Sequence, residues 1–157
     1  LIVSVKENIA SVSIGKLSTH GIVNDKKINE VSEKYIRELK IKTPDGNAIV
    51  GNLSGGNQQK VILGKWVAAD SQIIIFDEPT RGIDVSAKQE IYKLMNELVE
   101  AGKAIIMVSS DLPELLGMSD RIVVIAEGHK NGEVEKADFD QNYILDLASG
   151  GKVKGAV

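Results

Sequence analysis

Residues 73–80 have the sequence IIIFDEPT, in which four apolar residues are followed by two acids, a proline and a threonine. Apolar runs of this length are typical of strands buried on both faces of a parallel sheet. In open parallel sheets, ligands bind beyond the carboxyl ends of the strands, where Asp77 and Glu78 stand. An aspartate there can hold Mg2+, directly or through water, and the next acid can orient or deprotonate a water. Two solvated acids at a strand end are the plainer interpretation.

Upstream of this strand, residues 53–60 have the sequence LSGGNQQK, and a helix is predicted from about Asn57 to Ala69. Two glycines allow the backbone to approach a ligand closely. The N-terminal amides and the dipole of the helix favour an anion, and Ser54 adds a hydroxyl donor. The segment is therefore suited to face a phosphate. A glycine-rich turn with Ser54 as helix cap is the simpler alternative, because short motifs match by chance.

Downstream of residue 72, strands and helices alternate. Apolar runs predict further strands at 104–108 and 122–125, and the apolar spacing over 86–100 predicts an amphipathic helix. Asn131-Gly132 predicts the tight turn of a hairpin that pairs back onto the last strand. Strand–helix–strand repeats predict an α/β fold with a mostly parallel sheet and flanking helices.

The first third of the chain is mostly polar and is predicted to be helical. Ser4 and Glu7 have the spacing of a capping box, and the apolar period over 29–39 predicts a second helix. Trp66, which follows Ile62 by one helical turn, is expected in the core. The predicted organisation is a helical subdomain over 1–69, an α/β subdomain over 70–148 and a flexible tail over 149–157.

Composition excludes several classes of protein. The 157 residues are 43% hydrophobic and 26% charged, as in soluble globular proteins, and the net charge of −3 argues against a sequence-blind nucleic-acid binder. There is no cysteine, hence neither a disulfide framework nor a thiolate metal site. No apolar run approaches the roughly 20 residues that a membrane helix needs. The chain begins Leu-Ile-Val without Met, so we expect an excised piece of a longer protein.

Three segments in order, 53–60, 77–80 and 81–84, resemble the signature motif, the Walker B motif and the D-loop of ABC-transporter ATPases. The phrases LSGGNQQK and DEPTRGIDV are most similar to the second nucleotide-binding domain of bacterial importers for ribose, galactose, xylose and similar monosaccharides. The resemblance extends from about Ser4 to Ala148. It implies a P-loop NTPase (RecA-like) core with a helical signature subdomain, in a peripheral subunit at the cytoplasmic face of the bacterial inner membrane.

The resemblance also implies ligands, partners and residue roles. Asp77 would lie near Mg2+, and Glu78 would hold the attacking water. The signature would contact the γ-phosphate of an ATP held by the other nucleotide-binding domain of the same subunit, and the D-loop would cross the interface between the two domains. The helical subdomain would face a membrane permease, served by a periplasmic sugar-binding protein, and no nucleic acid is expected. The residues expected to line the ATP sites are Ser54, Gly55, Gly56, Asn57, Asp84 and Ser110.

Three features depart from the general pattern of the family. Ser110 takes the place of the usual switch histidine, and a hydroxyl cannot carry positive charge as an imidazolium can. Asn57 stands where the signature usually has glutamine; both changes are similar to second domains of sugar importers. No G-x-x-x-x-G-K-S/T phosphate loop occurs in the chain. We therefore expect the full-length subunit to be an ATPase and this chain alone to be inactive.

Two alternatives explain part of the pattern. An ABC-type ATPase of DNA repair or chromosome structure also has a signature and a Walker B motif, but this chain has neither coiled-coil heptads nor zinc-binding cysteines. A receiver-like or purely interacting domain could also place an aspartate at a strand end. A receiver needs an acidic pair on an earlier strand and a lysine after a later one, and those strands are not present in that order.

Overall fold

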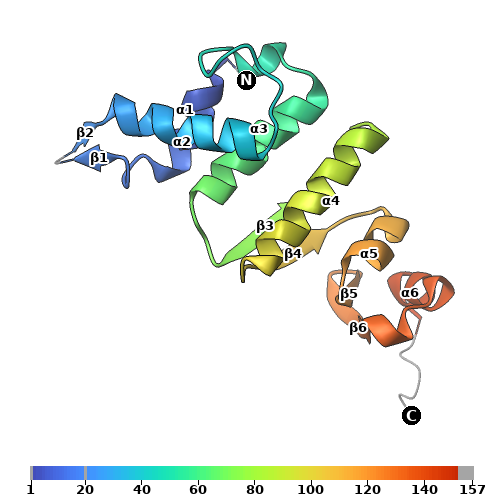
Figure 1. The fold of residues 1–157 in the computed structure, drawn as a ribbon. Helices are drawn as coiled ribbons and strands as arrows, with labels where there is room; N and C mark the ends of the chain where they lie inside the picture. Colours follow the sequence, from blue (N-terminus) through green and yellow to red (C-terminus); the bar gives the residue numbers. More distant parts are fainter. Residues whose placement is uncertain (1, 20, 152–157) are drawn as a thin grey trace. The chain divides into compact units, whose positions relative to one another are not determined.

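The structure is a computed structural model that describes residues 2–19 and 21–151. The chain divides into two compact units, residues 1–106 and 107–157. Strand β4 (Ala104–Val108) passes from the first unit into the second. The other elements of the first unit (Figure 1) are α1 (Val5–Ala10), η1 (Ser11–Ser13), β1 (Ser18–Thr19), β2 (Ile22–Val23), α2 (Asp25–Glu38), η2 (Val50–Asn52), α3 (Gly55–Ala68), β3 (Ile73–Asp77) and α4 (Val85–Glu100).

The predicted boundary between a helical and an α/β subdomain, at residues 69 and 70, falls inside the first compact unit. Upstream of this point the described residues are mainly helical, with one short antiparallel β1–β2 hairpin. The division into subdomains at this point therefore stays a prediction.

Helix α1 begins at the predicted capping box, which is confirmed. The Glu7 amide donates to Ser4 Oγ at 3.3 Å, and the Ser4 amide donates to the Glu7 carboxylate at 3.0 Å. The hydrogen bonds from Ser4 lower the pKa of Glu7. The buried side of α1 then packs with α2 and α3. The core of this region consists of Val5, Ile9, Leu39, Ile41, Val50 and Val61.

Trp66 does not lie in the core, so this expectation is wrong. Its side chain is 49% exposed, whereas Val61 and Leu63 of the same helix are buried. The spacing from Ile62 placed the tryptophan correctly on one side of α3, but that side is only partly covered. The Lys65 ammonium lies over the indole ring, 5.3 Å from its centroid.

Strands β3 and β4 form a two-stranded sheet and are connected by α4. The Ala104 amide donates to the Gln72 carbonyl at 2.9 Å. Since Gln72 directly precedes β3 and Ala104 begins β4, the two strands start side by side and run in parallel. Along β3, Ile74 and Phe76 are buried whereas Ile73 and Ile75 are exposed. The α/β class and the strand–helix–strand order are confirmed.

The second unit contains an antiparallel hairpin between two helices. Its turn is Glu127-Gly128, where φ is 49° and 78°, as a two-residue type I′ turn requires. Strand β5, which contains the strand predicted at 122–125, pairs with β6 in an antiparallel sheet. Within the described residues, the expected parallel sheet therefore consists of β3 and β4 alone. The elements are α5 (Leu112–Met118), β5 (Arg121–Ala126), β6 (His129–Glu135), η3 (Lys136–Asp138) and α6 (Gln141–Ala148).

The predicted turn at Asn131-Gly132 is wrong in position, although the hairpin itself is confirmed. Both residues lie inside β6. The side-chain Nδ2 of Asn131 donates to the carbonyls of Leu147 and Gly151 at 2.6 and 2.8 Å. A Cβ at Gly132 would lie 2.7 Å from Leu147 Cδ1, so this glycine is required by packing against α6 and not by a turn.

The predicted flexible tail, residues 149–157, lies outside the described residues from 152 onward. Gly150 has a φ of 87°, and the Gly151 amide donates to the Asp146 carbonyl at 2.9 Å, which closes the C-terminal end of α6. Among the described helices, none combines the length and the apolar character needed to cross a membrane.

Candidate functional site

The signature segment begins with Ser54, which stands at the N-cap position of α3 in an extended conformation. Its side chain makes no capping hydrogen bond to the helix backbone. Instead, Ser54 Oγ accepts a hydrogen bond from Asn57 Nδ2 at 2.8 Å. Ser54 and Gly55 are exposed. The alternative in which Ser54 serves only as a helix cap is therefore not the arrangement in the structure.

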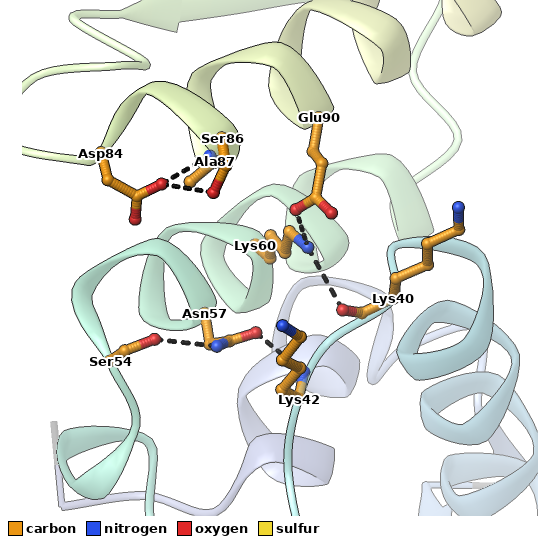
Figure 2. Close-up of polar contacts among 9 residues, drawn as sticks. All are labelled: Lys40, Lys42, Ser54, Asn57, Lys60, Asp84, Ser86, Ala87 and Glu90. Atoms are coloured by element: carbon orange, nitrogen blue, oxygen red, sulfur yellow. Dashed lines mark hydrogen bonds and ion pairs between the residues drawn. The ribbon is translucent and has the colours of Figure 1, made fainter.

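Asn57 connects the signature to a segment that precedes it in the chain. Its Oδ1 accepts a hydrogen bond from the Lys42 amide at 2.7 Å, while its Nδ2 donates to Ser54 (Figure 2). Lys42 lies in the irregular stretch that follows α2. The side-chain amide of Asn57 thus joins the N-terminus of α3 to the backbone of a second segment.

The signature helix α3 also contacts α4 closely. A Cβ at Gly56 would lie 3.0 Å from Ala87 Cβ, so glycine permits the short distance between the two helices. One turn further along α3, the Lys60 ammonium forms an ion pair with Glu90 at 2.5 Å and donates to the Lys40 carbonyl at 3.2 Å (Figure 2). The hydrogen bond from Lys60 is the main cause that lowers the pKa of Glu90.

The sequence pattern did not predict a functional role for Lys60 or Glu90. Lys60 is only 6% exposed, which is unusual for a lysine, whereas the Glu90 side chain is 49% exposed. The one available signal was the position of Lys60, four residues after Gly56 and hence on the same side of α3. Its partner on α4 could not be identified without the packing of the two helices.

The acids of the Walker B segment lie at the end of β3. Asp77 is the last residue of the strand and is exposed, and Glu78 is partly buried. Glu78 has a φ of 47°, in the left-handed region that non-glycine residues seldom occupy and that is enriched at functional sites. Its carbonyl accepts a hydrogen bond from the Arg81 amide at 3.2 Å. The chain therefore turns sharply at the second acid.

Asp84, in the D-loop, is the N-cap of α4. Its Oδ1 accepts hydrogen bonds from the Ser86 hydroxyl at 2.6 Å and from the Ala87 amide at 2.9 Å. The bond from Ser86, followed by that from Ala87, lowers the pKa of Asp84. The carboxylate is thus ionised at neutral pH and is oriented by the first turn of its own helix. Asp84 therefore has a structural role in addition to the predicted position at an interface.

Ser110 belongs to the second compact unit and lies between β4 and α5. Its neighbour Ser109 accepts a hydrogen bond from the Asp111 amide at 3.0 Å and donates to the buried carboxylate of Glu114. Asp111 is the N-cap of α5. The structure thus brings Ser54 and Asn57 into contact and places Asp77 beside Glu78, while Ser110 stands in a separate unit.

The donor groups of the first unit fit the phosphates of a nucleotide, and its acceptor groups fit Mg2+. The N-terminus of α3 offers backbone amides and a hydroxyl, which suit phosphate oxygens. Asp77 offers an exposed carboxylate, and Mg2+ is usually bound by one or two carboxylates together with substrate phosphates and water. In residues 2–19 and 21–151, no group of three or more histidine, cysteine or acidic side chains is arranged to hold a metal by itself.

Comparison with known proteins places these features in a family. The sequence profile of the family described as "ABC transporter" matches residues 2–81, just over half of the chain. The chain is 54% identical over 151 residues to a xylose import ATP-binding protein of Thermoanaerobacter pseudethanolicus, which covers 96% of the chain. It is 50% identical over 149 residues to a ribose import ATP-binding protein of Bacillus subtilis, covering 95% of the chain. The chain spans about 30% of the length of each of these relatives.

Solved structures support the same fold at lower identity. The dimeric, post-hydrolysis structure of an ATP-binding cassette bound to ADP and Pi matches 88% of this chain with a TM-score of 0.75 and 23% identity. A putative metal-chelate type ABC transporter in an inward-facing conformation matches 94% of the chain with a TM-score of 0.80 and 15% identity. The chain covers 59% and 58% of those two chains. The fold is therefore that of an ABC ATPase cassette.

Proposed function

Because the chain belongs to the ABC transporter family, we propose that it is the signature and Walker B portion of the ATPase subunit that energises a bacterial monosaccharide importer. The observation that carries the proposal is the 50–54% identity to ribose and xylose import ATP-binding proteins over about 95% of the chain. The local phrases LSGGNQQK and DEPTRGIDV, which resemble the second nucleotide-binding domain of such subunits, favour that position within the subunit.

The proposed role of the signature is to bind the γ-phosphate of an ATP held by the other nucleotide-binding domain. Ser54 and Gly55 are exposed at the start of α3, where amide donors and the helix dipole favour negative charge. Gly56 lets α3 approach α4 and so allows this end of the helix to be held against the D-loop helix. The arrangement supports a binding surface for phosphate oxygens, which accept hydrogen bonds but cannot donate them.

The proposed role of the acids is at this domain's own nucleotide site. Asp77 would hold Mg2+, which neutralises charge on the phosphates of bound ATP. Glu78 would orient the attacking water through its carboxylate, from a backbone conformation that turns it away from the direction of β3. Asp84, fixed by Ser86 and Ala87, would lie at the interface between the two domains, and Ser110 would occupy the switch position.

The proposed partners are those of an importer: a membrane permease bound through the helical region before residue 53, and indirectly a periplasmic sugar-binding protein. The subunit would lie at the cytoplasmic face of the inner membrane. The net charge of −3 supports this assignment over a DNA-repair or chromosome-structure ATPase, which would need a basic surface.

The test is reconstitution of the full-length subunit with its permease in liposomes. We expect ATP hydrolysis that increases when the sugar-loaded binding protein is added, together with uptake of a pentose or hexose. Tight duplex-DNA binding that weakens steeply with salt, with no sugar-dependent hydrolysis, would contradict the proposal. The 157-residue chain alone should bind Mg-ATP more weakly than about 10 µM, roughly −7 kcal/mol, because it contains no phosphate loop.

A further inference from the structure

The position of Asn57 in a hydrogen-bonded chain determines the direction of each bond in it. The Lys42 backbone amide is a donor, so the atom of Asn57 that faces it at 2.7 Å must be the carbonyl oxygen Oδ1. The other end of the same side chain is then the NH2 group, and this group faces Ser54 Oγ at 2.8 Å. The orientation of the side-chain amide is therefore set by a backbone group 15 residues earlier in the chain.

The direction of the Asn57–Ser54 bond has a consequence for the hydroxyl. A serine hydroxyl has one hydrogen to donate and two lone pairs that accept. Because Asn57 Nδ2 can only donate, Ser54 uses a lone pair for this bond and keeps its hydrogen for another acceptor. Ser54 is exposed at the N-terminus of α3, and a phosphate oxygen is an acceptor that can take this hydrogen.

We propose that Asn57 is a positioning residue that makes Ser54 a hydrogen-bond donor toward the γ-phosphate, and that it acts through Ser54 and not by contacting ATP itself. This inference rests on the proposed function, which supplies the phosphate. It changes the role expected for Asn57 from the sequence, where it was grouped with the residues that line the ATP site. The backbone amide of Lys42 then orients the Asn57 side chain, and Asn57 in turn orients the Ser54 hydroxyl (Figure 2).

The sharpest variant is Asn57→Asp, which preserves the size of the side chain. One oxygen of the introduced carboxylate can still accept from the Lys42 amide, so the local fold is retained. The other oxygen can only accept, so Ser54 must donate its hydrogen to that carboxylate or lose the bond. The hydroxyl is then withdrawn from the phosphate, and a negative charge lies nearby.

We expect steady-state ATPase turnover of the full-length subunit with its permease to fall on the order of 100-fold in Asn57→Asp, comparable to removal of a donor to a reacting oxyanion. The matched control is Asn52→Asp, which makes the same amide-to-carboxylate change two residues before Ser54. Asn52 is exposed, and its side chain makes no hydrogen bond within the described part of the chain. Its turnover should stay within about twofold of wild type, as expected for a solvated charge.

A double-mutant cycle separates a positioning role from a structural one. In the wild-type background, Asn57→Ala should lower turnover about five- to tenfold, the effect of one hydrogen bond. In a Ser54→Ala background, the same change should lower turnover little further, because Asn57 acts through the hydroxyl that is already missing. Equal losses in both backgrounds would overturn the inference, as would wild-type turnover in Asn57→Asp. Thermal melting of every variant identifies any that unfold. If Asn57→Ala unfolds, the comparison of the isosteric Asn57→Asp with its control Asn52→Asp decides whether the inference holds.

The same measurements separate the inference from the proposed function. If Ser54→Ala lowers turnover but Asn57→Asp and Asn57→Ala do not, the positioning role is wrong and the signature assignment stands. If the wild-type subunit has no ATPase activity, or Ser54→Ala has full activity, the proposed function of this segment fails and the inference fails with it.

Discussion

The signature segment, residues 53–60, and the Walker B segment with its D-loop, residues 77–84, are held in place in different ways. Asn57 and Lys60 make hydrogen bonds to backbone groups 15 and 20 residues earlier in the chain, and Lys60 also pairs with Glu90 on α4. The bonds described for the Glu78 carbonyl and the Asp84 carboxylate reach only three residues or fewer. The geometry of the signature therefore depends on tertiary packing, whereas the Asp84 carboxylate is oriented by the first turn of its own helix.

This difference indicates where substitutions should act. A change in the signature affects a network that joins α3, α4 and the segment after α2, so it can alter binding geometry and stability together. A Glu78→Gln change in the Walker B segment removes one charge and keeps the size of the side chain.

The largest expected effect is at Ser54. In the full-length subunit with its permease, Ser54→Arg places a bulky cation where the γ-phosphate is proposed to bind, and we expect turnover to fall roughly 10²–10³-fold. Glu78→Gln should reduce turnover less, because Glu78 is proposed to serve this domain's own site and not the site that the signature completes. The measurement is steady-state ATPase activity of both single variants. Loss of turnover in Glu78→Gln with near wild-type turnover in Ser54→Arg would reverse the comparison.

The ion pair between α3 and α4 should respond unequally to loss of either partner. Glu90→Gln removes the negative charge opposite the buried Lys60 ammonium, which keeps its hydrogen bond to the Lys40 carbonyl. We expect the free energy of unfolding to fall by about 1–2 kcal/mol, less than for a fully buried pair because Glu90 is half exposed. Lys60→Met replaces the cation with an apolar side chain of similar length and should cost less than about 1 kcal/mol.

Denaturant unfolding of the full-length variants measures both losses of stability. The exposed i,i+4 pair of Lys93 and Glu97 on the same helix provides the control, and Glu97→Gln should have almost no effect. A Lys60→Met variant less stable than Glu90→Gln would show that the hydrogen bond to Lys40, and not the ion pair, dominates.

A smaller effect is expected at the helix cap of the D-loop. Asp84→Ala removes the acceptor for the Ala87 amide and should lower the melting temperature slightly. Asp84→Asn retains a capping oxygen, so its melting temperature should be close to that of wild type. If turnover falls in both variants while melting recovers in Asp84→Asn, the carboxylate charge has a role at the interface beyond the cap. Unchanged melting in Asp84→Ala would show that the cap does not contribute.

The smallest expected effect is on acid stability. The pKa of Glu90 is lowered in the folded state, so its pairing with Lys60 stabilises the fold fully above the ordinary glutamate pKa. This contribution decreases as the pH falls through the lowered folded-state pKa, because the carboxylate must then be protonated. The difference in melting temperature between wild type and Glu90→Gln should therefore shrink between neutral pH and about pH 3. A constant difference would contradict the pairing.

The sequence by itself predicted the features that depend on neighbouring residues. The capping box at Ser4 and the α/β alternation are confirmed, and the helix expected over 86–100 is α4, Val85–Glu100. Asp77 and Glu78 were placed at the end of a strand, and the glycines of the signature before a helix; the structure has the acids there, and α3 begins at Gly55 itself. These features follow from residue type and spacing, because capping, periodicity and backbone preference act within one or two turns of chain.

Only the tertiary structure decided which distant groups meet. The bond from the Lys42 amide to Asn57, the burial of Lys60 against Glu90 and the exposure of Trp66 all depend on how separate helices pack. The hairpin turn lies at Glu127-Gly128, and Gly132 is instead required for contact with α6. Such contacts join residues far apart in the chain, and no local preference specifies their partners. Side-chain donors and acceptors therefore acquire a direction, as Ser54 does here, only once the elements that carry them are packed together.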